Sequence, residues 1–270
     1  MKNIKKILGL MMTATIIVGC GNSKVDGAND SSVEIGEVKQ EGDSEEAAAF
    51  GEKTAAEYPI SEESQAKLDA LETDYSKVNW QVEYEPIDGI VVSESMYVVD
   101  TAKWGPTNHM VVAFTNLTDD NVKISIEGYL ENEDGEVAHD LVEDDIEIWA
   151  GNTVAREIYF EFKVPSGNIK WNNITAEHLD REYVPYEIVP ELEKGDKGNY
   201  SIKPNIVSDP EHQNSYRCTG ECGLVLDKDG NILGGASDSS EYVSLLPMKV
   251  ESFGGKNADV VFFCNVFQIH

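Results

Sequence analysis

Closely spaced carboxylates are the first residues in this chain whose chemistry could define a site. Asp227-Lys228-Asp229-Gly230-Asn231 looks like the start of a calcium-binding loop. A loop of the EF-hand type places acids at positions 1, 3 and 5, glycine at position 6 and glutamate at position 12. Counted from Asp227, Gly230 is at position 4 and Asp238 is at position 12, so the spacing excludes that kind of loop.

A second acidic run offers a better set of calcium ligands. The segment AHDLVEDDIEI supplies four carboxylates that a loop at one end of a β-sandwich could gather around Ca²⁺: Asp140, Glu143, Asp144 and Asp145. The alternative is a solvated charged loop, which is the more common role of such a run. Calcium at these residues therefore stays a hypothesis, and no other cofactor is expected.

Three cysteines lie in the C-terminal part of the chain: Cys218, Cys222 and Cys264. The export signal described below permits a disulfide. Residues four apart on an extended strand are separated by roughly 13 Å, so Cys218 and Cys222 cannot bond to each other. Either could meet Cys264, and Cys222–Cys264 is the first choice, with one thiol left over. Zinc bound by the three cysteines with His212 or His270 is the alternative.

Catalytic signatures are absent from the sequence. It contains no GxSxG, HExxH, GxGxxG or Walker loop, so no catalytic residue is assigned and no enzyme activity is expected. A Ser–His–Asp set assembled only by folding is the alternative. Trp104, in the loop-like segment TAKWGPTNH, is the best candidate for stacking on a ligand such as a sugar. Trp149 and Trp171 occupy apolar strand patterns and are expected in the core.

Strands are the elements that must position these residues. From Trp80 onward, short runs rich in Val, Ile, Tyr and Phe are separated by turn residues, as in VKISIEGYL and DVVFFCNVF. This pattern predicts an all-β fold and lacks the strand–helix alternation of a parallel α/β protein. One short helix is predicted before the strands, over residues 61–76, with Ser61 as its cap.

Two segments of the strand region repeat each other. GYLENEDGEV (Gly128–Val137) and GLVLDKDGNIL (Gly223–Leu233) align without a gap, which brings Asp134-Gly135 onto Asp229-Gly230. Asp-Gly between two strands favours a hairpin turn, because glycine readily adopts a positive φ. The segment DKDGN is therefore predicted to be a turn and not a metal loop.

The repeat also predicts the domain organisation. Gly135 and Gly230 are 95 residues apart, close to the length of about 100 residues of an immunoglobulin-like unit. We therefore expect two tandem immunoglobulin-like β-sandwich units, residues 77–184 and 201–270, joined by a linker at 185–200.

The two hairpins resemble a known family. LENEDG (Leu130–Gly135) and VLDKDG (Val225–Gly230) are similar to the LYDxDG segment of FxLYD-type and related immunoglobulin-like domains on bacterial surfaces. The Phe and Tyr of the family's name are missing from both copies. The resemblance implies an immunoglobulin-like fold and a non-catalytic role, and it transfers no functional residue.

The N-terminus carries an export signal. Three lysines precede an apolar run, Ile7–Val18, that is too short to span a membrane as a lasting helix. The run ends in Ile17-Val18-Gly19-Cys20, which resembles the lipobox of bacterial lipoproteins. This resemblance implies that residues 1–19 are removed and that acyl chains such as palmitate on Cys20 anchor the protein to the cell membrane, on its extracytoplasmic face. The alternative is an ordinary signal peptide with an unrelated cysteine.

Composition bounds the remaining possibilities. Residues 20–60 are rich in acids, Gly, Ser and Ala, and this composition predicts a disordered acidic tether. Removing the signal removes three lysines and no acid, so the formal net charge moves from −29 to about −32. Such a surface repels nucleic acid.

The function expected from these features is that of a non-catalytic binding or interaction module of the cell envelope. Its partners would be the membrane, through Cys20, and an envelope protein or a glycan. A structural spacer or accessory subunit of an envelope complex is the alternative. A hydrolase with a site assembled by folding is less favoured.

Overall fold

A computed structural model of the chain describes residues 53–101, 105–132, 134–160, 166–180, 187–195, 199–207, 216–238, 247–250 and 258–268. All of them belong to one compact unit, Glu46–His270. The expected signal peptide, Cys20 and residues 20–52 of the expected tether lie outside the described residues. Within the described part, no helix is both long and apolar enough to cross a membrane.

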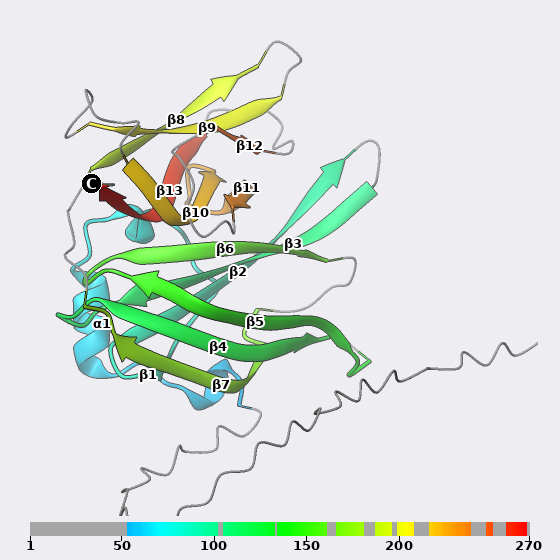
Figure 1. The fold of residues 1–270 in the computed structure, drawn as a ribbon. Helices are drawn as coiled ribbons and strands as arrows, with labels where there is room; N and C mark the ends of the chain where they lie inside the picture. The colour runs from blue at the N-terminus through cyan, green and yellow to red at the C-terminus, as the bar shows by residue number, and fades with distance from the viewer. Residues whose placement is uncertain are drawn as a thin grey trace, which may run out of the picture. The chain divides into compact units, whose positions relative to one another are not determined.

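The fold is all-β, as predicted, and the strands among the described residues form four antiparallel sheets (Figure 1). The described strands are β1 (Val82–Ile87), β2 (Ile90–Thr101), β3 (Gly105–Asn116), β4 (Val122–Glu131), β5 (Val137–Ile148), β6 (Thr153–Phe160), β7 (Ile169–His178), β8 (Ile188–Lys194), β9 (Tyr200–Ile206), β10 (Tyr216–Leu226), β11 (Ile232–Asp238), β12 (Met248–Val250) and β13 (Asp259–Gln268). The sheet orders are β5-β4-β7, β1-β2-β3-β6, β11-β10-β13 and β12-β9-β8.

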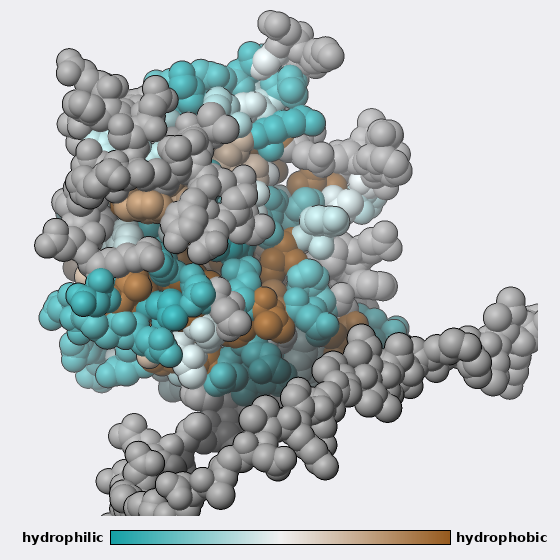
Figure 2. Space-filling model, viewed as in Figure 1, coloured by the Kyte–Doolittle hydropathy of each residue, from teal (hydrophilic) through white to brown (hydrophobic). Residues whose placement is uncertain are grey.

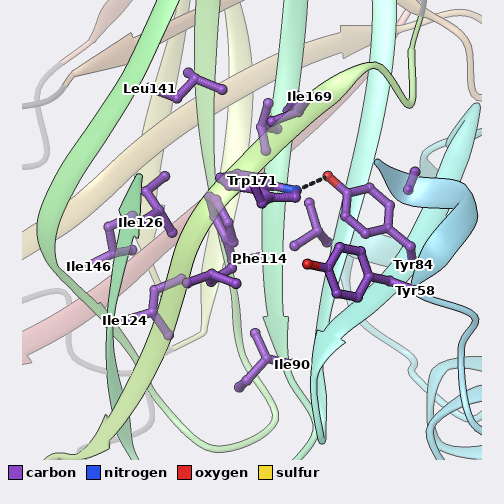
Figure 3. Packing of buried hydrophobic residues seen from close by; sticks show 14 of the residues in the cluster. Tyr58, Tyr84, Ile90, Phe114, Ile124, Ile126, Leu141, Ile146, Ile169 and Trp171 are labelled. Carbon is purple, nitrogen blue, oxygen red and sulfur yellow. Dashed lines mark hydrogen bonds between the residues drawn. The ribbon is translucent and has the colours of Figure 1, made fainter. Parts of the chain in front are cut away.

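The four sheets are stacked in that order, with a hydrophobic core between each pair of neighbours (Figure 1). The first core, between β5-β4-β7 and β1-β2-β3-β6, contains Phe114 and Trp171 (Figure 3). The second core lies on the other face of β1-β2-β3-β6 and contains Val111 and Leu224. The third core joins β10 and β13 to β9 through residues that include Ile202. The central part of the sheet β1-β2-β3-β6 is therefore buried on both faces, while Val98 and Tyr159 towards its far end are exposed.

Burial on both faces explains the sequence of β3. From Met110 to Asn116 every residue of this strand is buried, although the strand is antiparallel to both neighbours. Even-numbered residues such as Met110 and Phe114 face the first core, and odd-numbered residues such as Val111 and Ala113 face the second. A strand buried on both faces shows a continuous apolar run instead of alternation.

The structure describes the segment before the strands from Lys53 onward. Its elements are the 3₁₀ helix η1 (Ala55–Glu57), the helix α1 (Glu62–Asp69) and the 3₁₀ helix η2 (Asp74–Lys77). The side chain of Ser61 caps α1 by accepting a hydrogen bond from Ser64 N (3.2 Å), and two glutamates follow in the first turn. Part of the segment assigned to the tether is thus structured, because Tyr58 is buried and stacks on Tyr84 (Figure 3).

The two repeated hairpins have the same local hydrogen bonds. In the β10–β11 hairpin, Asp227 Oδ1 accepts from the backbone N–H groups of Asp229 (2.8 Å) and Asn231 (2.9 Å). In the β4–β5 hairpin, Asn132 Oδ1 accepts in the same way from Asp134 (3.0 Å) and Glu136 (2.9 Å). Gly230 and Gly135 have φ of 82° and 78°. The prediction that DKDGN forms a turn is confirmed.

Candidate functional site

A cavity of about 390 Å³ lies along β13, and we call it the β13 pocket. Its walls come from η2, the start of β6, the start of β8 and β13. Its apolar lining includes Ile188, Val189, Pro190, Phe262 and Val266. Cavities that bind small ligands have volumes of roughly 300–1,000 Å³ and combine apolar walls with a few polar groups. The β13 pocket has the size and the mixed lining of such a site.

Side chains from elsewhere in the chain hold the edge of β13 in place. β13 is the outer strand of its sheet, next to β10. Phe262 N–H donates to Asp74 Oδ2 (2.9 Å), and Asn152 Nδ2 donates to the Cys264 carbonyl oxygen (2.9 Å) and to Asn265 Oδ1 (2.9 Å). The unpaired N–H and C=O groups of an exposed edge strand tend to pair with a strand of another chain. Side chains that form hydrogen bonds with these groups prevent such pairing. Three side-chain hydrogen bonds therefore hold this wall of the pocket.

Side-chain contacts hold the η2 side of the pocket as well. Trp80 stacks on Tyr75 with ring centroids 5.6 Å apart, and its Nε1 donates to the Tyr75 carbonyl oxygen (3.2 Å). The Tyr75 hydroxyl donates to Glu83 and is 2.8 Å from Ser93 Oγ. Burial and the hydrogen bond to Glu83 raise the pKa of Tyr75 above its ordinary value, so this phenol stays neutral.

The polar lining of the pocket carries more negative than positive charge. Asp74 Oδ1 accepts from Lys77 Nζ (2.7 Å), which neutralises one acid. Glu72 and Glu187 also line the pocket, and both are exposed. On the face that Figure 2 shows, the described surface is mostly hydrophilic. A cavity with one apolar wall and two exposed carboxylates in its lining suits a ligand that has an apolar body and a positive charge.

The structure brings Cys264 to Cys218 and not to Cys222. Cys264 Sγ and Cys218 Sγ are 3.3 Å apart, and both residues belong to the third core. Cys222 belongs to the second core, on the other face of the sheet. All three cysteines are buried, free thiols. The geometry therefore favours Cys218–Cys264 over the expected Cys222–Cys264 pair.

A β-bulge explains why Cys222 faces the wrong way for the expected pair. Cys218 is opposite Val266 and Thr219 is opposite Asn265, but Cys222 is opposite Phe263, so the register shifts between Thr219 and Cys222. Without the bulge, residues four apart would share a face. Gly220, inside the bulge, has φ of 67°. A glycine inside a strand is a known sign of a bulge, and Gly220 was the available signal in the sequence.

The four expected calcium ligands lie on strand β5 and not in a loop. Glu143 forms an ion pair with Arg156 (3.3 Å), and Asp145 forms one with Lys123 (2.8 Å). Asp140 is opposite Tyr129 and exposed, and the side chain of Asp144 lies outside the described residues. Among the described residues, no group of three or more His, Cys, Asp or Glu side chains could hold a metal ion.

The remaining expected site residues have separate outcomes. Trp104 lies outside the described residues, so the stacking hypothesis receives no test. His212 and His270 lie outside them too, but the expected zinc site is wrong in its cysteines, because Cys222 lies on the opposite face of the sheet from Cys218 and Cys264. Trp149 and Trp171 are fully buried, which confirms the prediction that they belong to the core.

Sequence reasoning missed a partly buried polar cluster around Glu157. The hydroxyl of Tyr97 donates to Glu157 Oε1, and His109 Nδ1 is 3.0 Å from the same atom. His109 Nε2 is 2.9 Å from Thr107 Oγ1. Tyr97 on β2 is paired with His109 on β3. The sequence contains no local motif that predicts this pairing. The Thr107 hydroxyl also bonds to the Val99 carbonyl oxygen (3.2 Å). The cluster satisfies a half-buried carboxylate.

A second buried carboxylate was also missed. Glu94 on β2 is fully buried; its Oε1 accepts from the Tyr84 hydroxyl (2.6 Å) and its Oε2 from the Gly167 N–H (2.7 Å). Trp171 Nε1 donates to the Tyr84 hydroxyl (2.9 Å), as the dashed line in Figure 3 shows. Burial raises the pKa of Glu94. Glu94 lies on the face of β2 that packs against the first core, so the glutamate is buried where the first two sheets meet.

Comparison with known proteins assigns no relative to this chain. No protein-family model matches it, and no curated protein gives a significant match. The residues themselves therefore carry the functional argument.

Proposed function

We propose that this chain is a lipid-anchored binding module on the extracytoplasmic face of the cell membrane and that it acts without catalysis. The lipobox-like segment ending in Cys20 supports the anchor, and the β13 pocket supports the binding role. The pocket is the observation that carries the proposal, because its volume and its mixture of apolar and charged lining residues are those of a ligand site.

The charge of the pocket defines the class of ligand. Glu72 and Glu187 supply negative charge at the rim, while Ile188, Val189 and Pro190 supply apolar surface. A basic peptide side chain or an organic amine with an aliphatic body matches both features. The strongly acidic chain, with a formal net charge of −29, favours the approach of a cation over that of an anion.

Two probes of equal length and opposite charge test the pocket directly. We expect hexylammonium to show saturation transfer from the protein in ligand-observed NMR, and hexanoate to show little. Val189→Trp, at a position 42% exposed, fills the pocket and should abolish the hexylammonium signal. Val142→Trp, on β5 at a position 63% exposed and away from the pocket, is the matched control and should leave it unchanged. Equal signals from all three proteins, or no signal for either probe, would contradict the pocket.

The anchor is tested separately from the pocket. Cys20→Ser should move the chain from the membrane fraction to the soluble fraction, and its intact mass should lack acyl chains. The hexylammonium signal should persist in this variant, since the pocket lies within the folded unit. A Cys20→Ser chain that stays in the membrane fraction would show that another feature attaches the protein.

A further inference from the structure

We propose that Cys218 and Cys264 form an intrachain disulfide in the exported protein and that this bond fixes the wall of the β13 pocket. The proposal depends on export and not on the identity of the ligand. It assigns the third cysteine, Cys222, as a permanent thiol.

The geometry of β10 and β13 brings the two sulfur atoms together. Cys218 Sγ and Cys264 Sγ are 3.3 Å apart across antiparallel strands. Because Cys218 is opposite Val266, Cys264 is its diagonal neighbour, two residues along the partner strand. Both side chains are buried on the same face of the sheet, among residues that include Ile202. A bond between them needs a small approach of the sulfur atoms and no movement of an element.

The same sheet keeps Cys222 out of the pair. The bulge after Thr219 turns Cys222 to the opposite face, where Leu224 and Phe263 surround it. Cys222 is fully buried, and burial raises its thiol pKa, so little thiolate is present to react. The backbone of the sheet separates its sulfur from Cys264, and a buried thiol of this kind is inert.

The oxidation needs an external acceptor, which we take to be a protein or low-molecular-weight disulfide outside the membrane. The thiolate of one cysteine attacks that disulfide, breaks its S–S bond and forms a mixed disulfide, with one acceptor sulfur leaving as a thiol. The thiolate of the other cysteine then attacks the mixed disulfide and displaces the second acceptor sulfur as a thiol. The two cysteines together lose two protons and two electrons, and the acceptor gains them. Burial raises the thiol pKa of Cys218 in the folded chain, so we expect the exchange to take place during folding, before β10 and β13 close.

The bond has a consequence for the pocket because Cys264 lines it. Its carbonyl oxygen already accepts from Asn152 on the pocket side. A disulfide to Cys218 would link Cys264 covalently to β10. β13 would then be restrained by β10 through the disulfide and by Asn152 through the hydrogen bond. Reduction would release one of these two restraints and loosen the wall without removing any group that faces a ligand.

Peptide mapping of the full chain tests the pairing. The protein is taken from the membrane fraction into acid, denatured without reductant, alkylated with N-ethylmaleimide and digested with Glu-C protease. Cleavage after Glu221 separates Cys218 from Cys222. We expect the Cys218 peptide to be linked to the Cys264 peptide until a phosphine reductant is added, and Cys222 to carry N-ethylmaleimide. Cys222→Ser should keep the link, and Cys218→Ser should lose it.

Three outcomes would overturn the proposal: a link through Cys222, full alkylation of all three cysteines before reduction, or a link between two chains. A thermal measurement is an independent check, because a bond that closes a loop of this length stabilises the fold. Reductant should lower the Tm of the wild type and of Cys222→Ser by roughly 10 °C. It should not change the Tm of Cys264→Ser. Failure of hexylammonium to bind would leave these results unaffected, so the two proposals can fail independently.

Discussion

Asp74 and Phe262 lie 188 residues apart in the chain, and the carboxylate of Asp74 accepts a hydrogen bond from the backbone N–H of Phe262 (2.9 Å). This contact joins the short 3₁₀ helix before the first strand to the edge of the last strand. It also fixes two walls of the β13 pocket with respect to each other. The segment before the strands is therefore part of the folded unit and of its candidate site.

Replacing Asp74 should destabilise the protein more than its surface position suggests. Asp74→Ala removes the acceptor of the Phe262 N–H as well as the ion pair with Lys77, and we expect a loss of about 1–3 kcal/mol in the free energy of unfolding. Lys77→Ala removes only the exposed ion pair and should cost at most about 0.5 kcal/mol. Urea unfolding of both variants measures the difference. Equal losses would show that the bond to Phe262 contributes nothing.

The two hairpin glycines should respond differently to the same substitution. Both have positive φ, so alanine at either position is strained by about 1–2 kcal/mol. At Gly135 a Cβ atom would meet nothing within 4 Å, whereas at Gly230 it would lie 2.6 Å from the Lys77 carbonyl oxygen. We expect Gly230→Ala to exceed Gly135→Ala by at least about 1 kcal/mol in urea unfolding. Similar values would mean that the β10–β11 turn is not packed against residues 77–79.

Glu94 and Glu85 should give the protein opposite dependences on pH. Burial raises the pKa of Glu94, so its contribution to stability is full below the unfolded value of about 4.3 and is lost as the pH rises through the folded pKa. Although burial acts to raise the pKa of Glu85 too, hydrogen bonds from Ser61, Ser64 and Gly89 outweigh it and lower that pKa. Its contribution is present above about 4.3 and is lost as the pH falls through the folded pKa.

The measurement compares each glutamine variant with the wild type across these two windows. As the pH falls from neutral towards the unfolded value of about 4.3, the unfolding free energy of the wild type should rise relative to Glu94→Gln. As the pH falls from about 5 to about 3, the wild type should lose stability relative to Glu85→Gln. The same slope for both variants would contradict the opposite environments of these two carboxyl groups.

Removing the Tyr84 hydroxyl should lower the free energy of unfolding, because this group forms two buried hydrogen bonds. Tyr84→Phe leaves Glu94 Oε1 without its donor and Trp171 Nε1 without its acceptor, and both groups are buried. We expect a loss of about 1–3 kcal/mol in the free energy of unfolding. Tyr159→Phe, at a position 75% exposed, is the control and should stay within about 0.5 kcal/mol of the wild type. A neutral Tyr84→Phe would show that water replaces the hydroxyl.

Local patterns in the sequence were sufficient to predict the all-β class and both repeated turns. Alternating apolar residues mark half-buried strands such as β4, and Asp-Gly marks the turns at Gly135 and Gly230. The core positions of Trp149 and Trp171 followed from the same patterns. These features depend on neighbours along the chain, which is why a single sequence reveals them.

Features that depend on distant neighbours could not be predicted in this way. The second core exists because Val111 and Ala113 on β3 meet Leu224 on β10, more than a hundred residues later. The choice of Cys218 as the neighbour of Cys264 depends on one bulge, which a count of residues does not show. The β13 pocket combines η2, β6, β8 and β13, and no motif in any of them points to the others.

The segment from Lys53 to Asn79 also determines how the folded unit would bear mechanical load. Lys53 bridges to Trp171, the N–H of Ser61 donates to Glu85 (2.7 Å), and Asn79 N–H donates to the Gly230 carbonyl oxygen (2.9 Å). These contacts reach β7, β1 and the β10–β11 hairpin, which belong to three different sheets. A tension applied to the chain at Lys53 would break these three attachments one after another before it reached strand β1. The turn at Asp227–Asn231 is the last of these attachment points.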